Sequence, residues 1–129
     1  MSLFRCTLYS LIGERILLLA VKNDQITSQI VAINLFYLNR RDKIENTIHE
    51  GFIGVTHEAA GQGIATQMRK LAKAHFTSLG IKGISTRISL NNSASLRSAQ
   101  EIGFEPVEQY RDPQTLEERY YMICKLEEK

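Results

Sequence analysis

Apolar runs separated by short polar links dominate the first half of the chain. Residues 15–22 form a continuous apolar run, which is typical of a strand buried on both faces. Residues 30–38 form a second run rich in β-branched and aromatic side chains, and the Asn-Asp pair at 23–24 supplies turn chemistry between them. After the charged connection 39–43, residues 47–55 make a third candidate strand. Three successive strands with short polar links predict an antiparallel meander.

The spacing of apolar positions changes to that of a helix at Gly61. The expected core-facing positions of this helix are Ile64, Met68, Leu71, Phe76 and Leu79, and the positions expected on its other faces are Arg69, Lys70 and Lys73. Gly80 follows as a residue that ends the helix. Apolar and polar residues then alternate from 84 to 90, which predicts a further strand.

A short helix and a hairpin are expected in the last part of the chain. The Asn-Asn-Ser sequence at 91–93 is typical of a helix start, and Gly103 stops this helix. Residues 105–110 and 118–126 form the two strands of the hairpin, joined by a turn at 112–113, Asp-Pro. The predicted order of elements describes one domain of the α/β (α+β) class.

Composition limits the partners and the location that we expect. The chain has 129 residues, 43% hydrophobic and 23% charged, with a net charge of +2; this fits one domain over 1–129 without the clustered basic face of a nucleic-acid binder. Its longest apolar run, 16–21, is too short to cross a bilayer. Cys6 and Cys124 stand apart from any CxxC pair or histidine cluster, so we expect reduced, buried cysteines rather than a disulfide or metal site. We therefore expect a cytoplasmic protein with no metal, nucleic-acid or membrane partner.

The segment 55–66 runs from a strand end through a loop of small residues into a helix start. Such a turn leaves backbone N–H groups unpaired at the helix N-terminus, where the helix dipole also favours negative charge. Glycines at 61 and 63, followed by Ala65, would let a pyrophosphate approach the backbone without meeting a Cβ. A plain strand-to-helix turn would carry the same two glycines, so this pattern alone leaves both readings open.

Two other nucleotide-binding motifs fit this segment poorly. A Walker A loop requires GxxxxGK[ST], and the chain contains no such run. The dinucleotide fingerprint requires a third glycine or alanine where Thr66 stands, and an acidic residue after the next strand, where Asn91 and Asn92 stand.

The segment resembles instead the acetyl-CoA signature of the GNAT acetyltransferase family, a strand followed by [RQ]-x-x-G-x-[GA]. Gly63 and Ala65 match its last two fixed positions. A second signature of the family, Asn-x-x-[AS] opening a helix that ends in Leu/Ile-Gly-Phe, is matched by residues 92–95 and 102–104. The strand at 84–90 lies between the two signatures, as the family requires. Both signatures in this order and at this separation make the resemblance specific.

This resemblance implies a GNAT fold, with a mixed and mostly antiparallel sheet flanked by helices, and acetyl-CoA (coenzyme A) as co-substrate. The cofactor-binding residues that it implies are Val55, Gly61, Gln62, Gly63, Ile64, Ala65, Thr66, Asn92 and Ser95. Backbone N–H groups near Val55 would stabilise the charge that develops on the thioester oxygen.

Two positions depart from the family pattern. Ala60 stands where the first signature has Arg or Gln, and Ala99 stands where many members carry a tyrosine that protonates the departing thiolate. Relatives similar to the ribosomal-protein N-terminal acetyltransferases carry a serine at the position of Ser95 and lack that tyrosine, so the sequence is nearer to that branch.

Transfer to an amine requires the neutral amine, although a lysine-like amine has a pKa of about 10.4. His49 and Glu50, on the strand at 47–55, are the candidate catalytic bases, with a preference for Glu50 because family members with a base on this strand hold a glutamate close to this position. Their side chains point to opposite faces, so at most one faces the acceptor. Either could equally be an exposed charge on a strand.

Four further residues have a chemical and a structural reading. We expect His57 to be a solvent-facing loop residue and His75, on one helix face with Leu71, to be a partly buried packing residue. Tyr120 and Tyr121 follow each other in the last strand, so one must face the sheet surface. Core packing is the expected role of these tyrosines, and protonation of the thiolate is the alternative.

The sequence thus predicts an N-acetyltransferase that moves the acetyl group of acetyl-CoA to a primary amine of a small molecule or peptide. The alternative is a catalytically inactive acyl-CoA-binding or protein-interaction module of the same fold, which the alanines at 60 and 99 favour. The intact Gly63, Ala65 and Asn92 favour the enzyme.

The N-terminal region is shorter than that of proteins resembling this family, which begin with a strand and two helices before the hairpin. Only residues 1–14 precede Arg15, and residues 5–9 look like one short strand. With a reduced N-terminal helical region, an apolar sheet face would lose cover, which predicts a homodimer. The alternative is a monomer in which the C-terminal hairpin folds over the gap.

Overall fold

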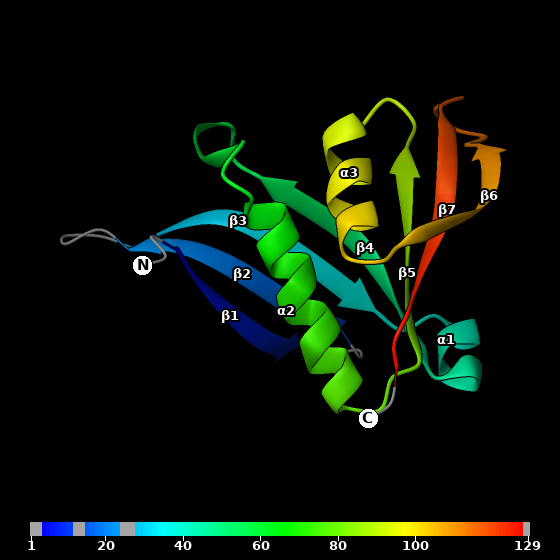
Figure 1. Ribbon diagram of the computed structural model, residues 1–129, viewed down its shortest axis with the longest axis horizontal. Helices are drawn as coiled ribbons and strands as arrows, with labels where there is room; N and C mark the ends of the chain where they lie inside the picture. The colour runs from blue at the N-terminus through cyan, green and yellow to red at the C-terminus, as the bar shows by residue number, and fades with distance from the viewer. Residues whose placement is uncertain (1–3, 12–14, 24–27, 128–129) are drawn as a thin grey trace.

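A computed structural model describes residues 4–11, 15–23 and 28–127. Its strands are β1 (Phe4–Leu11), β2 (Arg15–Asn23), β3 (Ser28–Tyr37), β4 (Thr47–Val55), β5 (Gly83–Ser89), β6 (Glu105–Arg111) and β7 (Glu118–Lys125). Its helices are α1 (Arg40–Glu45), α2 (Ile64–Ser78) and α3 (Ser93–Glu101), with a 3-10 turn η1 (His57–Ala59). The strands form one sheet in the order β1-β2-β3-β4-β5-β7-β6 (Figure 1).

Within the described chain, β4 and β5 are the parallel pair and every other neighbouring pair is antiparallel. The expected mixed, mostly antiparallel sheet with flanking helices is therefore confirmed, as is the meander of β2, β3 and β4. The predicted turn at 23–24 falls partly outside the described residues. Only residues 12–14 separate β1 from β2, which leaves no room for helices between these two strands.

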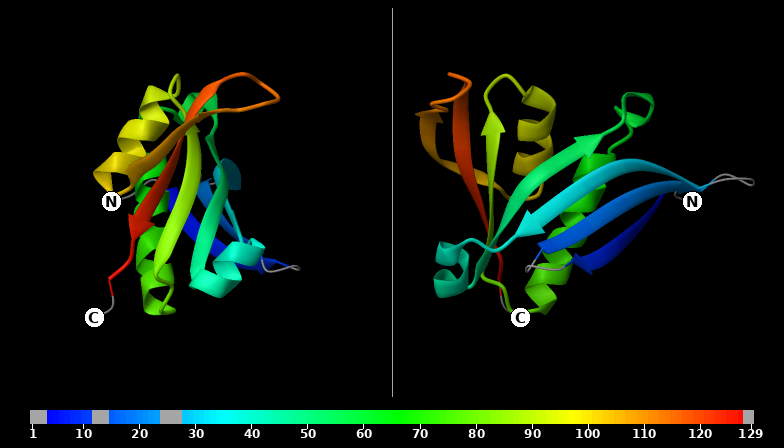
Figure 2. Two further views of the ribbon diagram at one scale, coloured as in Figure 1. Left: turned by 90° about the vertical axis from the view of Figure 1, so that its right-hand side faces the viewer. Right: turned by 180° about the vertical axis from the view of Figure 1, so that it is seen from behind.

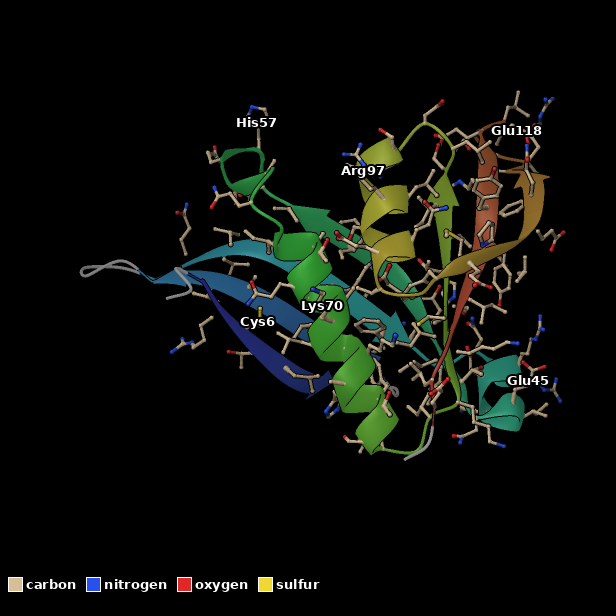
Figure 3. All side chains as sticks on the ribbon, viewed as in Figure 1. Cys6, Glu45, His57, Lys70, Arg97 and Glu118 are labelled. Atoms are coloured by element: carbon tan, nitrogen blue, oxygen red, sulfur yellow. The ribbon has the colours of Figure 1, made fainter. Side chains whose placement is uncertain are left out.

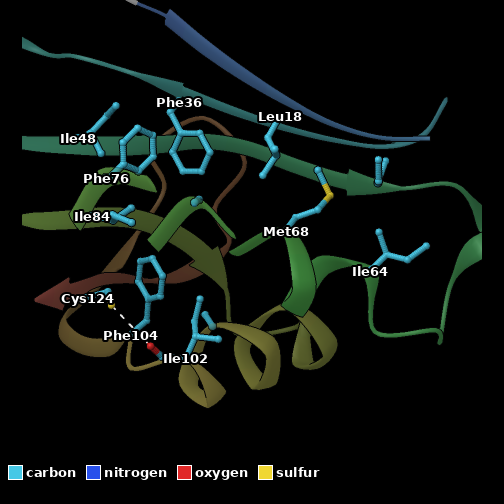
Figure 4. Packing of buried hydrophobic residues seen from close by; sticks show 14 of the residues in the cluster. Leu18, Phe36, Ile48, Ile64, Met68, Phe76, Ile84, Ile102, Phe104 and Cys124 are labelled. Atoms are coloured by element: carbon cyan, nitrogen blue, oxygen red, sulfur yellow. Dashed lines mark hydrogen bonds between the residues drawn. The ribbon is translucent and has the colours of Figure 1, made fainter. Parts of the chain in front are cut away.

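The two longer helices, α2 and α3, lie on the same face of the sheet (Figures 1 and 2). Along α2, the buried side chains of Ile64, Met68 and Phe76 face the sheet, and the Phe76 ring meets that of Phe36 edge-on, with centroids 5.0 Å apart (Figure 4). Burial of each such side chain contributes about 1.5–3 kcal/mol. This layer of apolar contacts fixes α2 against β2, β3 and β4.

The buried face of α2 differs from the predicted one. Leu71 and Leu79 are 43% and 59% exposed, whereas Arg69 is only 1% exposed. The stripe that faces the sheet passes through 64, 68, 72 and 76, so Leu71 and Leu79 fall on the neighbouring stripe. A buried ion pair, described below, holds Arg69 in the interior.

The charged connection predicted at 39–43 is in fact part of a helix, α1 (Arg40–Glu45). The backbone N–H of Asn39 donates to Oδ2 of Asp42 (2.8 Å), and Oγ1 of Thr47 donates to Oδ1 of the same carboxylate (2.7 Å). Asp42 thereby satisfies one N–H at the helix start and ties α1 to β4.

The later elements agree with their predictions. Gly80 has φ +78° directly after the last residues of α2, a conformation that glycine adopts without a Cβ penalty. Between β6 and β7, Oδ1 of Asp112 accepts the N–H groups of Gln114 and Thr115, as expected of a turn. The hairpin extends the sheet beside β5. No helix among the described residues is long and apolar enough to span a membrane.

The β4–β5 pair diverges along its length, which opens the sheet on one side. Their parallel pairing runs from Thr47↔Gly83 to Glu50↔Thr86 and ends there. The register of β4 against β3 shifts at the next residue, Gly51, so β4 turns away from β5 (Figure 1). The starts of α2 and α3 lie over the widening gap.

Candidate acyl-CoA cleft

A cavity of about 520 Å³ lies where the end of β4 meets the first turns of α2 and α3. Of the nine predicted cofactor residues, eight line it: Val55, Gly61, Gly63, Ile64, Ala65, Thr66, Asn92 and Ser95. Gln62 is the ninth and is not in the lining. Residues that the sequence reasoning missed, among them Ile53, Ala59, Arg97 and Glu101, complete the wall.

The start of α2 presents backbone donors to this cavity. Gly61 and Gly63 adopt left-handed conformations, with φ of +78° and +75°, and a Cβ added at either would meet no atom within 4 Å. No side chain caps the helix at Gly63. The N–H groups of the first turn therefore face open space beside the positive end of the helix dipole. A phosphate group fits this turn, because both the space and the donors are present.

The start of α3 differs, because a side chain caps one N–H group of its first turn. Oδ1 of Asn92 accepts the N–H of Ser95 (3.1 Å), which makes Asn92 the N-cap of the helix. Thr66 of α2 donates to Oγ of Ser98 (3.2 Å), which links the two helices across the cavity. Asn92 is therefore a structural residue of this wall as well as part of its lining.

A buried polar cluster stands at the point where β4 and β5 diverge. Nε and one terminal nitrogen of Arg69 donate to the two carboxylate oxygens of Glu50, at 3.1 and 2.7 Å. Arg69 also donates to the backbone carbonyl of Ser95 (2.9 Å) and to its Oγ (3.1 Å). Thr86 of β5 donates to Glu50 Oε1 (3.1 Å). Asn34 of β3, with its amide nitrogen facing Glu50, donates to Oε2 (3.2 Å). The cluster joins β3, β4, β5, α2 and α3.

Residues 7–104 match the acetyltransferase (GNAT) family. The chain belongs to this family. Among curated proteins, none matches the chain.

Solved structures of GNAT proteins share its fold at low sequence identity. The chain is similar to a structure of the NatC complex bound to Gag peptide and CoA, with a TM-score of 0.77, 19% identity, and coverage of 86% of this chain and 71% of the other. It is also similar to the ribosomal-protein-S18-alanine N-acetyltransferase from Escherichia coli, with a TM-score of 0.75, 11% identity, and coverage of 93% and 74%. For nourseothricin acetyltransferase the TM-score is 0.74, the identity 13%, and the coverage 97% and 84%.

Within this GNAT fold, Glu50 is on the helix side of the sheet and His49 on the other, as their alternation predicted. Both oxygens of Glu50 accept hydrogen bonds from Arg69, so the carboxylate is engaged within the protein. His49 is buried against Ser85, with Nδ1 and Oγ 2.7 Å apart, and lies outside both the acyl-CoA cleft and the lining of the neighbouring cavity. Burial, together with the charge of Arg87, lowers the pKa of His49. The prediction that either residue is the base gains no support from this geometry.

The two other histidines and the two tyrosines of β7 lie where a structural role predicts. His57 is exposed in η1 (Figure 3), and His75 is partly buried beside Phe76. Tyr120 packs against the core. Tyr121 stacks on Arg87 instead, with the guanidinium 4.8 Å from the ring centre.

Ala99 is fully buried, so the helix-side position where many family members carry a phenol holds only a methyl group here. Cys6 and Cys124 are free thiols, and burial raises the pKa of both. Among the described residues, no group of three or more His, Cys, Asp or Glu side chains is placed to hold a metal ion.

Arg69 is the buried charged residue of the site that sequence reasoning missed. Helical spacing assigned it to a polar face, because an arginine beside Met68 normally points to solvent. The available signal was a lone glutamate on an otherwise apolar strand, since a buried carboxylate needs a charged partner.

Proposed function

We propose that this GNAT protein is an N-acetyltransferase that moves the acetyl group of acetyl-CoA to a primary amine. The observation that supports it is the open start of α2, where two left-handed glycines and an uncapped first turn line a cavity of about 520 Å³. Ile53, Gly54 and Val55, at the end of β4 beyond its pairing with β5, line the same cavity. This arrangement offers N–H donors to the phosphates and to the thioester region.

Acetyl transfer from a thioester to an amine can proceed without a side chain that acts as an acid. Bound acetyl-CoA would supply the thioester, and residues 61–66 would hold its pyrophosphate. The amine forms the C–N bond, the C–S bond breaks, the sulfur leaves as thiolate, and the proton lost by the amine goes to solvent. Because alkyl thiols have a pKa of about 8.5, the thiolate leaves readily without an acid. The methyl group at Ala99 is therefore compatible with turnover.

A thiol-release assay tests the proposal. The protein is mixed with acetyl-CoA and a panel of amines, peptides and polyamines, and free CoA thiol is measured against a blank without acceptor. We expect release with at least one acceptor and its loss in the Gly63→Leu variant, whose side chain would occupy the open space at the α2 start. Tight binding of CoA without release in any arm would contradict the enzyme.

The second candidate is a non-catalytic acyl-CoA-binding module. It is favoured by Ala99 and by the buried ion pair that engages Glu50, the one carboxylate of β4, with Arg69. In that case CoA would bind with the same dependence on Gly63, and no amine would be acetylated.

We also propose that the protein forms a homodimer through the face of the sheet that α2 and α3 do not cover (Figure 2, right). Phe52 and Ile33 lie on this face with exposed fractions of 55% and 38%. The β6–β7 hairpin continues the sheet beside β5, which supports this proposal over a monomer in which the hairpin folds over the sheet. Light scattering at low micromolar concentration should give twice 14.7 kDa, and Phe52→Lys should restore 14.7 kDa. A wild-type mass of 14.7 kDa that persists on concentration would exclude the dimer.

A further inference from the structure

A second cavity, of about 290 Å³, lies in the gap between the diverging strands β4 and β5. It adjoins the acyl-CoA cleft, with which it shares Ile53, Asn92 and Ser95. An acceptor in this cavity would therefore reach the acyl group from the side opposite the phosphates. The charged residues of its lining are Glu50, Arg69, Arg87, Glu117 and Arg119.

The arginines of this lining differ in whether an acidic partner already balances their charge. Arg69 and Glu50 neutralise each other in the buried ion pair. Arg87 is held between two rings, with its guanidinium 5.1 Å from the centre of Tyr110 and 4.8 Å from that of Tyr121. Among the described residues, Arg87 has no hydrogen-bond or ion-pair partner. Its N–H edges therefore remain available, while the rings restrict its conformations.

Arg119 is ion-paired with Asp112 and supplies a second donor, its Nε, that lacks a hydrogen-bond partner. Its Nε is buried and makes no hydrogen bond within the described part of the chain. The nearest carboxylate oxygen, Oδ2 of Asp112, is 3.6 Å away, beyond hydrogen-bond length. A buried donor without a partner is costly, so a ligand oxygen that reached Arg119 would remove that cost.

We propose that this cavity selects acceptors in which a carboxylate or a similar anionic group lies close to the primary amine, with Arg87 and Arg119 binding the anion. The inference rests on the proposed acetyltransferase function and names its substrate class. Arginine binds carboxylates through two parallel hydrogen bonds, which fixes the acceptor in one orientation. Apart from Glu50, which is paired with Arg69, Glu117 is the carboxylate of the lining, and Asp112, outside the lining, is ion-paired with Arg119; Arg87 therefore carries the positive charge that the described residues leave without an ion-pair partner.

The positive charges of Arg87 and Arg119 also favour the neutral form of the acceptor amine. A positive surrounding disfavours the ammonium form, so the amine loses its proton more readily beside Arg87 and Arg119 than in water. A base on β4 is then unnecessary, which agrees with the engagement of Glu50 by Arg69. The anionic group of the acceptor supplies the attraction that a bare amine would lack.

The test compares two hexapeptides that differ only at the second residue, Asp or Lys, with free aspartate as a third acceptor. Initial rates of thiol release from acetyl-CoA give kcat/KM for each. We expect the Asp peptide to exceed the Lys peptide by at least about tenfold, the range of a hydrogen bond to a charged group. Acetylation of aspartate would identify an amino acid as sufficient, and acetylation of the peptide alone would identify a peptide N-terminus. Equal rates, or a preference for Lys, would overturn the proposal.

Variants assign the preference to the arginine. Arg87→Met should lower kcat/KM for the Asp peptide by about tenfold or more, and by several times more than it changes kcat/KM for the Lys peptide, whereas Arg87→Lys should restore part of the loss. The matched control is Arg111→Met, on the edge strand β6, where the arginine is exposed, paired with Glu118 and outside the lining. Equal losses for both peptides in Arg87→Met would overturn the assignment.

A binding measurement separates this inference from the proposed function. The Asp peptide is titrated calorimetrically into the CoA-saturated protein, without turnover. Binding that Arg87→Met abolishes would support the anion site even if no acceptor is acetylated, whereas no binding of the Asp peptide would overturn it. Turnover of Lys peptides alone would support the acetyltransferase and refute this substrate class.

Discussion

The starts of α2 and α3 line the same cavity and are built in opposite ways. The first turn of α2 follows two left-handed glycines and has no side-chain cap. The first turn of α3 is capped by Asn92 and anchored from below by Arg69, which binds both the carbonyl and the hydroxyl of Ser95. The first turn of α2 has no side-chain cap, whereas in α3 one N–H group, that of Ser95, is capped. The start of α2 is thus the part of the cavity wall that can bind a ligand, and the contacts of α3 hold the rest of that wall in place.

The largest expected effect comes from removing the anchor of α3. Arg69→Met leaves the buried carboxylate of Glu50 without its charged partner, and we expect a loss of about 3–5 kcal/mol in the free energy of unfolding. Urea denaturation measures it. The double variant Arg69→Met/Glu50→Gln should recover much of the loss, because no unpaired charge remains. If the loss in the double variant equalled the sum of the losses in Arg69→Met and Glu50→Gln, this account would be contradicted.

The next effect tests the open start of α2. CoA at a hundredfold excess over its Kd should raise the free energy of unfolding by about 2.7 kcal/mol. Gly63→Leu should abolish this gain, because its side chain enters the open space of the cavity. Gly80→Leu is the matched control: it has the same left-handed conformation and the same open surroundings, but lies outside the cavity. Both variants should lose about 1–2 kcal/mol from backbone strain, and a retained gain in Gly63→Leu would place the ligand elsewhere.

A smaller effect concerns the cap that α3 provides for itself. Asn92→Ala removes the acceptor of the Ser95 N–H and should cost about 1 kcal/mol, while Asn92→Asp should cost little. The control at the other helix is Gln62→Ala, which should change stability by less than about 0.5 kcal/mol because α2 has no side-chain cap. Equal losses in Asn92→Ala and Gln62→Ala would remove the contrast between the two helix starts.

The last prediction is a pH dependence that should arise on the other face of β4, away from both helix starts. Burial lowers the pKa of His49, so the unfolded chain binds a proton more readily than the folded one. Stability should therefore fall as the pH drops through about 6.5, the ordinary histidine value. Unfolding at pH 7.5 and 5.5 should show a smaller fall in His49→Gln than in the wild type, and an unchanged fall in the control His57→Gln, since His57 is exposed. An identical fall in His49→Gln would assign the dependence to other groups.

The contrast between the two helix starts was only half visible in the sequence. The two glycines and Ala65 predicted a helix start open to a phosphate, and the Asn-Asn-Ser sequence predicted the start of α3, because turn and cap residues act over a few neighbouring positions. The strand bounds 47–55 were predicted for the same reason, from local alternation and a change of period. The helix α1 was missed although its Asn39-x-x-Asp42 spacing was a local signal.

Tertiary structure decided which charges lie inside. Arg69 reads as a solvent-facing helix residue, and Glu50 as a candidate base, until the fold places them 2.7 Å apart beneath α3. The lone glutamate of β4 signalled that a charged partner is needed, but not which residue supplies it, because Glu50 and Arg69 belong to elements whose relative position depends on how α2 packs on β4. Likewise, Arg87 meets Tyr110 and Tyr121 only once three strands lie side by side. Local chemistry thus set the elements and the phosphate turn, and long-range packing set the electrostatics of the acceptor side, since a charge is stable in the interior only where distant parts of the chain supply its partner.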